Sequence, residues 1–186
     1  MTEAVATIDL AAFRRNVETL VAIAAPSEVM LAVKADAYGH GMLPVSLAAL
    51  DAGATALAVL EVSAGLQLRA AGVTVPLFAW LHGTGTDFRA AAESRIDLGV
   101  SAVWQLDAIA ESGASVPARV HLKIDTGLSR NGASAEDWPE LVSTALHLQS
   151  QGFLEVYGAW SHLADASAAD DEIGRASCRE RVWTVV

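Results

Sequence analysis

The sequence predicts an α/β protein built on a parallel sheet. Short apolar runs, typical of buried strands, alternate with longer segments in which apolar residues recur at helical spacing. Glycine follows several of the helical segments, as it does at many helix C-termini. Parallel strands are expected because repeated strand–helix units join neighbouring strands through crossover helices. Both a doubly wound sheet and a (β/α)8 barrel fit this pattern.

The first element is predicted to be an amphipathic helix over 8–24, with Asp9 as its N-cap. Further helices are expected at 42–52, 63–71, 88–94, 103–111 and 138–149. Strands are expected at 29–33, 56–60, 75–81, 96–100, 118–125 and 154–162. A complete barrel typically needs about 250 residues, so a barrel here would have about six of its eight units.

Composition points to one ordered domain without nucleic-acid or membrane partners. The 186 residues are 53% apolar and only 18% charged, which suits a single core. A net charge of −10 without a basic cluster disfavours nucleic acid and anionic membranes. No apolar run is long enough to span a membrane, and the N-terminus lacks signal-peptide features. We therefore expect a cytoplasmic, soluble protein.

Cysteine and histidine usage predicts no metal site. Cys178 is the only cysteine, so neither an internal disulfide nor a cysteine metal site is expected. The histidines show no metal-ligand spacing.

Lysine usage draws attention to two positions. Lys34 and Lys123 are the only lysines among 12 basic side chains. Arginine can replace lysine as a surface charge, but it cannot condense with an aldehyde as a primary amine does. Each lysine is therefore a candidate for a special role.

The segment around Lys34 carries the first candidate site. Lys34 follows an apolar strand, at the end where α/β folds gather functional groups. Gly39 and Gly41 let the backbone pass close to a ligand, and Tyr38 can offer a phenol. A surface lysine in a helix-capping loop is the structural alternative.

A polar strand carries the second candidate site. Strand alternation places Arg119, His121, Lys123 and Asp125 on one face, opposite Val120, Leu122 and Ile124. Strands of parallel sheets are usually apolar on both faces, so this one is either an edge strand or lines a polar pocket. A turn at 125–127 would then present Arg130, whose guanidinium suits a carboxylate.

Two other predicted strands end in polar or glycine-containing segments. The strand at 154–162 delivers His162 to the same rim as the two lysines. The segment 79–85 contains glycines but is read as an ordinary strand–helix loop.

Together these segments resemble alanine racemase. The shared stretches, in the family's order, are IDL at 8–10, AVKADAYGHG at 32–41, KIDTGLSRNG at 123–132 and SHLA at 161–164. The resemblance covers 8–165. It implies a barrel that binds pyridoxal 5′-phosphate (PLP), followed by a β-rich domain, in a head-to-tail homodimer. The implied reaction interconverts L-alanine and D-alanine, an isomerase activity that supplies D-alanine for peptidoglycan.

The resemblance also implies residue roles. Lys34 would bind the cofactor covalently and act as the base on the D-alanine side. Tyr38 would contact the cofactor phosphate, and His162 would pack against its ring. Arg130 would approach the cofactor's phenolic oxygen and the substrate carboxylate. Lys123 matches a lysine that is often carbamylated in the family, and its carbamate would orient Arg130. The family's opposite-face base is a tyrosine of the C-terminal domain.

The segment 173–186 differs from the rest. Residues 173–182 hold three arginines and Cys178, and the string resembles a translated sequencing adapter. We predict that native sequence stops near Asp171 or Glu172. Residues 1–172 would then be the N-terminal part of a racemase-like barrel whose C-terminal β domain is absent, and we expect the chain as written to be inactive.

Three alternatives remain at this point. A related PLP-dependent amino-acid decarboxylase shares the AVKA core, and a non-catalytic PLP-binding protein that manages cofactor supply needs no second domain. The third is an α/β domain without a cofactor.

Overall fold

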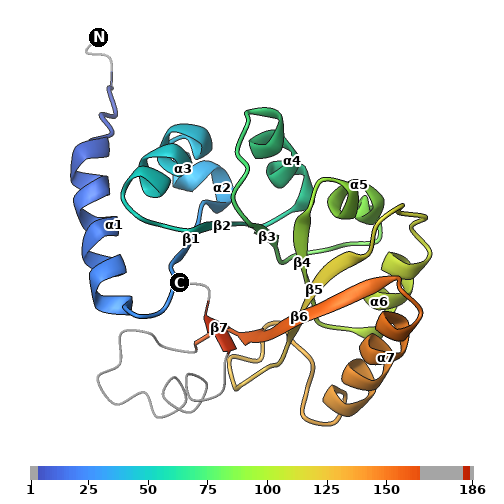
Figure 1. Ribbon diagram of the computed structural model, residues 1–186. Coiled ribbons are helices and arrows are strands. Elements are labelled where there is room, and N and C mark those ends of the chain that lie inside the picture. Colours follow the sequence, from blue (N-terminus) through green and yellow to red (C-terminus); the bar gives the residue numbers. More distant parts are fainter. Residues whose placement is uncertain (1–3, 164–181, 185–186) are drawn as a thin grey trace.

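The computed structural model describes residues 4–163 and 182–184, which form one parallel sheet with helices. The strands follow one another across the sheet in chain order, and Figure 1 shows them curving into an arc. They are β1 (Met30–Ala32), β2 (Ala56–Val59), β3 (Leu77–Ala79), β4 (Ile96–Val100), β5 (Ala118–Lys123), β6 (Leu154–Ser161) and β7 (Val182–Thr184). A doubly wound sheet would reverse this order at a switch point. The described residues therefore form part of a (β/α)8-type barrel.

The helices that alternate with the strands lie on the convex side of the arc, α1 precedes β1, and the short α2 is a turn at the end of β1 (Figure 1). They are α1 (Leu10–Ala24), α2 (Lys34–Gly39), α3 (Met42–Asp51), α4 (Val62–Ala70), α5 (Phe88–Glu93), α6 (Val103–Ala110) and α7 (Trp138–Ser150). Asp9 caps α1 as predicted, because its carboxylate accepts hydrogen bonds from the backbone N–H groups of Ala11 and Ala12, each at 2.9 Å. None of the described helices is long and apolar enough to span a membrane.

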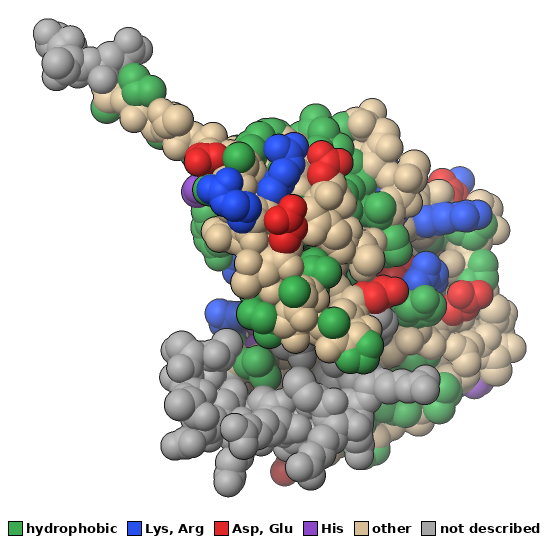
Figure 2. Space-filling view, turned by 60° about the vertical axis from the view of Figure 1, so that its left-hand side comes forward, with side chains coloured by type: hydrophobic (Ala, Val, Ile, Leu, Met, Phe, Trp, Pro, Cys, Tyr) green, Lys and Arg blue, Asp and Glu red, His purple; other side chains and the backbone are tan. Residues whose placement is uncertain are grey.

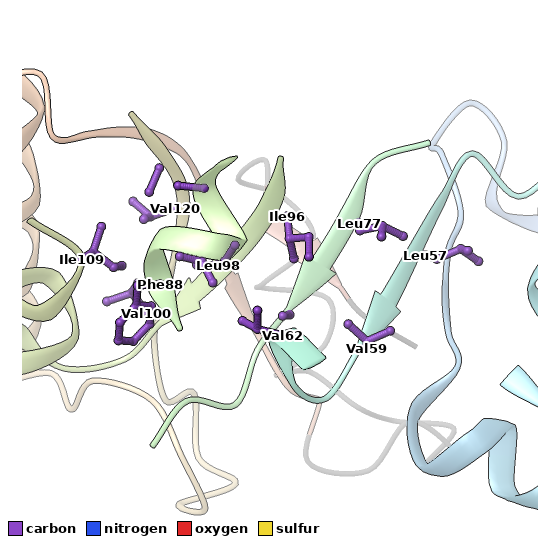
Figure 3. Packing of buried hydrophobic residues seen from close by; sticks show 14 of the residues in the cluster. Leu57, Val59, Val62, Leu77, Phe88, Ile96, Leu98, Val100, Ile109 and Val120 are labelled. Atoms are coloured by element: carbon purple, nitrogen blue, oxygen red, sulfur yellow. The ribbon is translucent and has the colours of Figure 1, made fainter. Parts of the chain in front are cut away.

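The main core lies between the sheet and its outer helices. Every second strand residue points outward and is buried there, as Leu57, Leu77, Leu98 and Val120 are in Figure 3. This two-residue period follows from the pleat of a strand.

The concave side of the sheet holds a second, smaller cluster. Phe78 and Trp160 meet edge to face with ring centroids 5.1 Å apart, beside Ala58 and Trp80. Gly99 leaves space for them, because a Cβ atom there would lie 2.9 Å from Phe78 and 3.1 Å from Trp160. This aromatic layer lies inside the barrel, next to the inward-facing residues of β5.

The segment α2, for which the sequence predicts no regular element, is a left-handed turn between β1 and α3. Ala35, Asp36, Ala37 and Tyr38 have φ values of 51–55°. Left-handed helical backbone costs non-glycine residues roughly 1–2 kcal/mol each. The Asp36 carboxylate offsets part of this cost by accepting a 2.6 Å hydrogen bond from the N–H of Met42, and the Gly41 N–H donates to the Asp36 carbonyl. Local propensity opposes such a turn, so the sequence pattern did not reveal it.

The described part of 173–186 is strand β7. Its backbone pairs in parallel with β6, with Val182 opposite Ala159. The boundary expected near Glu172 lies outside the described residues and stays a prediction.

The face shown in Figure 2 carries basic and acidic side chains close to one another. On that face they do not gather into a basic patch of the kind that binds nucleic acid.

Candidate functional site

Three predicted site residues lie at the same rim of the barrel. Lys34 lies just beyond β1, Lys123 is the last residue of β5, and His162 directly follows β6. The strands are parallel, so these positions are at the C-terminal ends, where barrel folds place their functional groups.

Positively charged side chains at this rim act on His162. Burial and, to a smaller extent, the positive charges of Lys123, Arg130 and Lys34 together lower the pKa of His162 to about 4. The three cationic side chains therefore all lie close enough to His162 to act on its ring. The Nδ1 atom of His162 is buried and has no hydrogen-bond partner among the described residues. At neutral pH the imidazole is uncharged in this cationic environment.

Lys123 is buried against an aromatic ring. Its side chain is only 2% exposed, and Nζ lies 4.6 Å from the ring centroid of Trp160. Burial lowers the pKa of Lys123 to about 8, with a further contribution from Arg130, while Asp125 acts in the opposite direction. A sizeable fraction of this amine is therefore neutral near pH 8, and only a neutral amine is nucleophilic.

Arg130 is presented by a tightly closed turn, as predicted. The Asp125 carboxylate accepts hydrogen bonds from the N–H groups of Gly127 and Ser129, each at 3.0 Å, and these bonds lower its pKa. At the base of the loop, the Asp125 N–H donates to the Ala133 carbonyl. Gly132 allows this closure, because a Cβ atom there would lie 2.6 Å from the Asp125 nitrogen. Asp125 itself lies beyond β5, which ends two residues earlier than predicted.

Tyr38 lies at the outer side of the site. Its side chain is 70% exposed, and the Nζ atom of Lys34 lies 5.7 Å from its ring centroid. The left-handed turn brings the two residues together, whereas the expected contact of Tyr38 with a cofactor phosphate stays a prediction.

The polar face of β5 lines the barrel interior. β5 pairs with β4 on one side and β6 on the other, which excludes the edge-strand alternative. Val120 and Leu122 face the helices, whereas His121 faces Phe78 at a ring-centroid distance of 5.1 Å.

Asp97 was missed in the sequence. This buried carboxylate on β4 contacts both His121 and Arg119 through one oxygen, at 3.1 and 3.2 Å. An acidic residue inside an otherwise apolar strand was the signal that would have found it. Trp160 was also missed as a contact of Lys123 and His162, because the sequence gives no indication of which ring would reach the rim.

The segment 79–85 is an ordinary strand–helix loop, but it buries a histidine. The His82 ring packs edge to face on Phe88 with centroids 5.4 Å apart, and burial lowers its pKa to about 4.

Comparison with known proteins identifies the family. The family model described as the N-terminal domain of alanine racemase matches residues 8–182. The chain belongs to this family. An alanine racemase from Salinispora tropica is 48% identical over 170 residues, which are 90% of this chain and 45% of that protein. The chain thus spans just under half the length of this relative.

Solved structures of racemases share the fold. The alanine racemase from the D-cycloserine-producing Streptomyces lavendulae superposes with a TM-score of 0.88 at 42% identity, over 92% of this chain and 46% of that one. A histidine racemase from Leuconostoc mesenteroides superposes with a TM-score of 0.78 at 27% identity, over 91% and 46% of the two chains.

Proposed function

We propose that this chain supplies the cofactor-binding part of a PLP-dependent alanine racemase. The observation that carries the proposal is the position of Lys34, a primary amine just beyond the C-terminal end of β1, at the same rim of the barrel as Lys123 and His162. The relatives with 48% and 42% identity are named alanine racemases, which favours alanine as the substrate.

The residues present fit PLP, which is an anionic aromatic aldehyde. Within the described residues, Lys34, Lys123 and Arg130 form no ion pair with a carboxylate, and all three act on His162, so their positive charges would attract an anion bound beside that ring. When bound, PLP supplies an electron sink that stabilises negative charge at the α-carbon of an amino acid.

Each side chain then has a proposed role. Lys34 holds the cofactor through its amine and moves the α-proton on the D-alanine side. Tyr38 binds the cofactor phosphate, and the neutral ring of His162 packs against the cofactor ring. Arg130 binds the substrate carboxylate and approaches the phenolic oxygen. Carbamylation of Lys123 would replace its positive charge with a negative one that orients Arg130.

Two properties of the whole protein belong to the same proposal. We expect a homodimer and a cytoplasmic location, as the family resemblance implies. Sedimentation velocity of the PLP-bound protein tests the first, and fractionation of the source cells tests the second.

Chiral chromatography of a panel of amino acids tests the reaction and its substrate. The likeness to a histidine racemase makes histidine the informative competitor. Conversion of alanine well above histidine and serine, dependent on added PLP and lost in Lys34→Ala, supports the proposal. Conversion of histidine in preference to alanine would make histidine the substrate. Absence of any PLP-dependent conversion by the whole protein would show that it is not a racemase.

A further inference from the structure

Two hydroxyl groups join the loop that carries Arg130 to the strand that leads to His162. The Oγ1 atom of Thr126 and the Oγ atom of Ser161 lie 2.6 Å apart, although the residues are 35 positions apart in the sequence. Both hydroxyls also lie 3.4 Å from the carbonyl oxygen of His162. Ser161 is 3% exposed, so its hydroxyl is shielded from competing water.

The pair lies where the backbone ladder between β5 and β6 ends. The Ile124 N–H donates to the Trp160 carbonyl at 3.1 Å. Beyond that bond the loop turns back on its own strand. The Asp125 carboxylate accepts hydrogen bonds from within the loop, and the Asp125 N–H donates to the Ala133 carbonyl. The Thr126–Ser161 contact therefore continues the connection between the strands one step past their last backbone hydrogen bond.

We propose that Thr126 and Ser161 are positioning residues that fix the Arg130 loop relative to His162. Without the pair, the loop would still be closed at its base, but its orientation toward β6 would be free to vary. A displacement of the guanidinium by a fraction of an ångström weakens a bidentate contact with an anion, because such contacts depend on direction. The expected effect on PLP binding rests on the proposed function, whereas the expected effect on the orientation of the loop does not.

Hydrogen exchange by NMR on the folded, whole chain tests the effect on the loop. Thr126→Val keeps the shape and removes the hydroxyl, and Ser161→Ala removes its partner. Each should speed exchange of the Gly127 and Ser129 amides on the order of fivefold, the usual effect of losing one hydrogen bond. The urea midpoint should fall only by the equivalent of this one hydrogen bond, which leaves the chain folded without denaturant. Thr126→Ser, which retains the hydroxyl, should restore slow exchange.

The double variant and a matched control complete the experiment. Because the two hydroxyls act on each other, Thr126→Val/Ser161→Ala should exchange no faster than either single variant. Ser143→Ala removes a hydroxyl that bonds within α7 and should change nothing at the loop. Unchanged exchange in Thr126→Val, or global unfolding that Thr126→Ser does not rescue, would overturn the proposal.

A PLP titration separates this inference from the proposed function. Weaker PLP binding in Thr126→Val, with wild-type affinity in Thr126→Ser, supports positioning toward the cofactor. If the wild-type chain binds no PLP while the exchange results hold, the pair remains a loop anchor and the proposed function fails. If PLP binds equally to all variants, the pair does not position the loop toward the cofactor, and the proposed function stands.

Discussion

The Nζ atom of Lys123 lies 4.6 Å from the ring centroid of Trp160, inside the barrel and beneath the rim that carries His162. The indole face attracts a cation, whereas burial and the charge of Arg130 lower the pKa of this lysine to about 8. The side chain is therefore close to the boundary between an ammonium ion and a reactive amine.

We predict that Lys123 forms a carbamate with CO2. At constant dissolved CO2, carbamylation should rise as the pH increases through about 8, because only the neutral amine reacts. Carbon-13 NMR with labelled CO2 would detect one carbamate signal that disappears in Lys123→Arg. A signal that persists in this variant would assign the carbamate to another amine.

Much of the fold follows from the hydrophobic pattern. Strand 96–100 and the starts of α3, α5, α6 and α7 lie where predicted, because alternation and helical spacing report burial directly. The left-handed turn at Ala35–Tyr38 could not be predicted, since its residues locally disfavour that conformation. It is held by longer-range bonds such as that between Asp36 and Met42.

Part of the candidate site could likewise be predicted from the sequence, and part could not. Lys34, Lys123 and His162 could be placed at one rim from strand ends alone, and the resemblance supplied the roles of Tyr38 and Arg130. The contacts of Asp97 and the pairing of Thr126 with Ser161 join separate strands, so no local pattern encodes them.

Asp97→Asn should destabilise the barrel. The Asp97 carboxylate is buried and is shared by the buried His121 ring and the partly exposed Arg119 guanidinium, so the variant leaves both without a charged acceptor. Breaking such a buried pair costs about 3–5 kcal/mol of unfolding free energy. Urea denaturation measures the change. Asp107→Asn, at an exposed position on α6, is the matched control, and an equal effect in both variants would show that Asp97 has no structural role.

Gly99→Ala should also destabilise the protein, by overpacking the interior. The new Cβ would lie 2.9 Å from Phe78 and 3.1 Å from the backbone of Trp80. Overpacking of this kind typically costs about 1–3 kcal/mol. Gly85→Ala is the control, because a Cβ there meets nothing within 4 Å. Thermal unfolding that shifts no more for Gly99→Ala than for Gly85→Ala would contradict the described packing.

His82 should make the fold sensitive to acid. Burial holds its folded pKa at about 4, compared with an ordinary value of 6.5. As the pH falls from 6.5 to about 4, the unfolded chain takes up a proton that the folded chain does not, so stability decreases. The full effect corresponds to roughly 3 kcal/mol.

The contribution of His82 can be isolated with His82→Leu. This variant should show a flatter loss of stability between pH 6.5 and 4, whereas His147→Gln, on the exposed side of α7, should retain the wild-type slope. Parallel pH profiles for wild type and His82→Leu would mean that this imidazole does not titrate abnormally.

The attachment of PLP to Lys34 is the most direct test of the account. The folded chain is incubated with PLP, reduced with borohydride, digested and mapped by mass spectrometry. We predict a pyridoxyl group on Lys34 that persists in Lys123→Arg and disappears in Lys34→Arg. A folded chain that carries the label on Lys123 instead, or no label at all, would contradict the proposed role of Lys34.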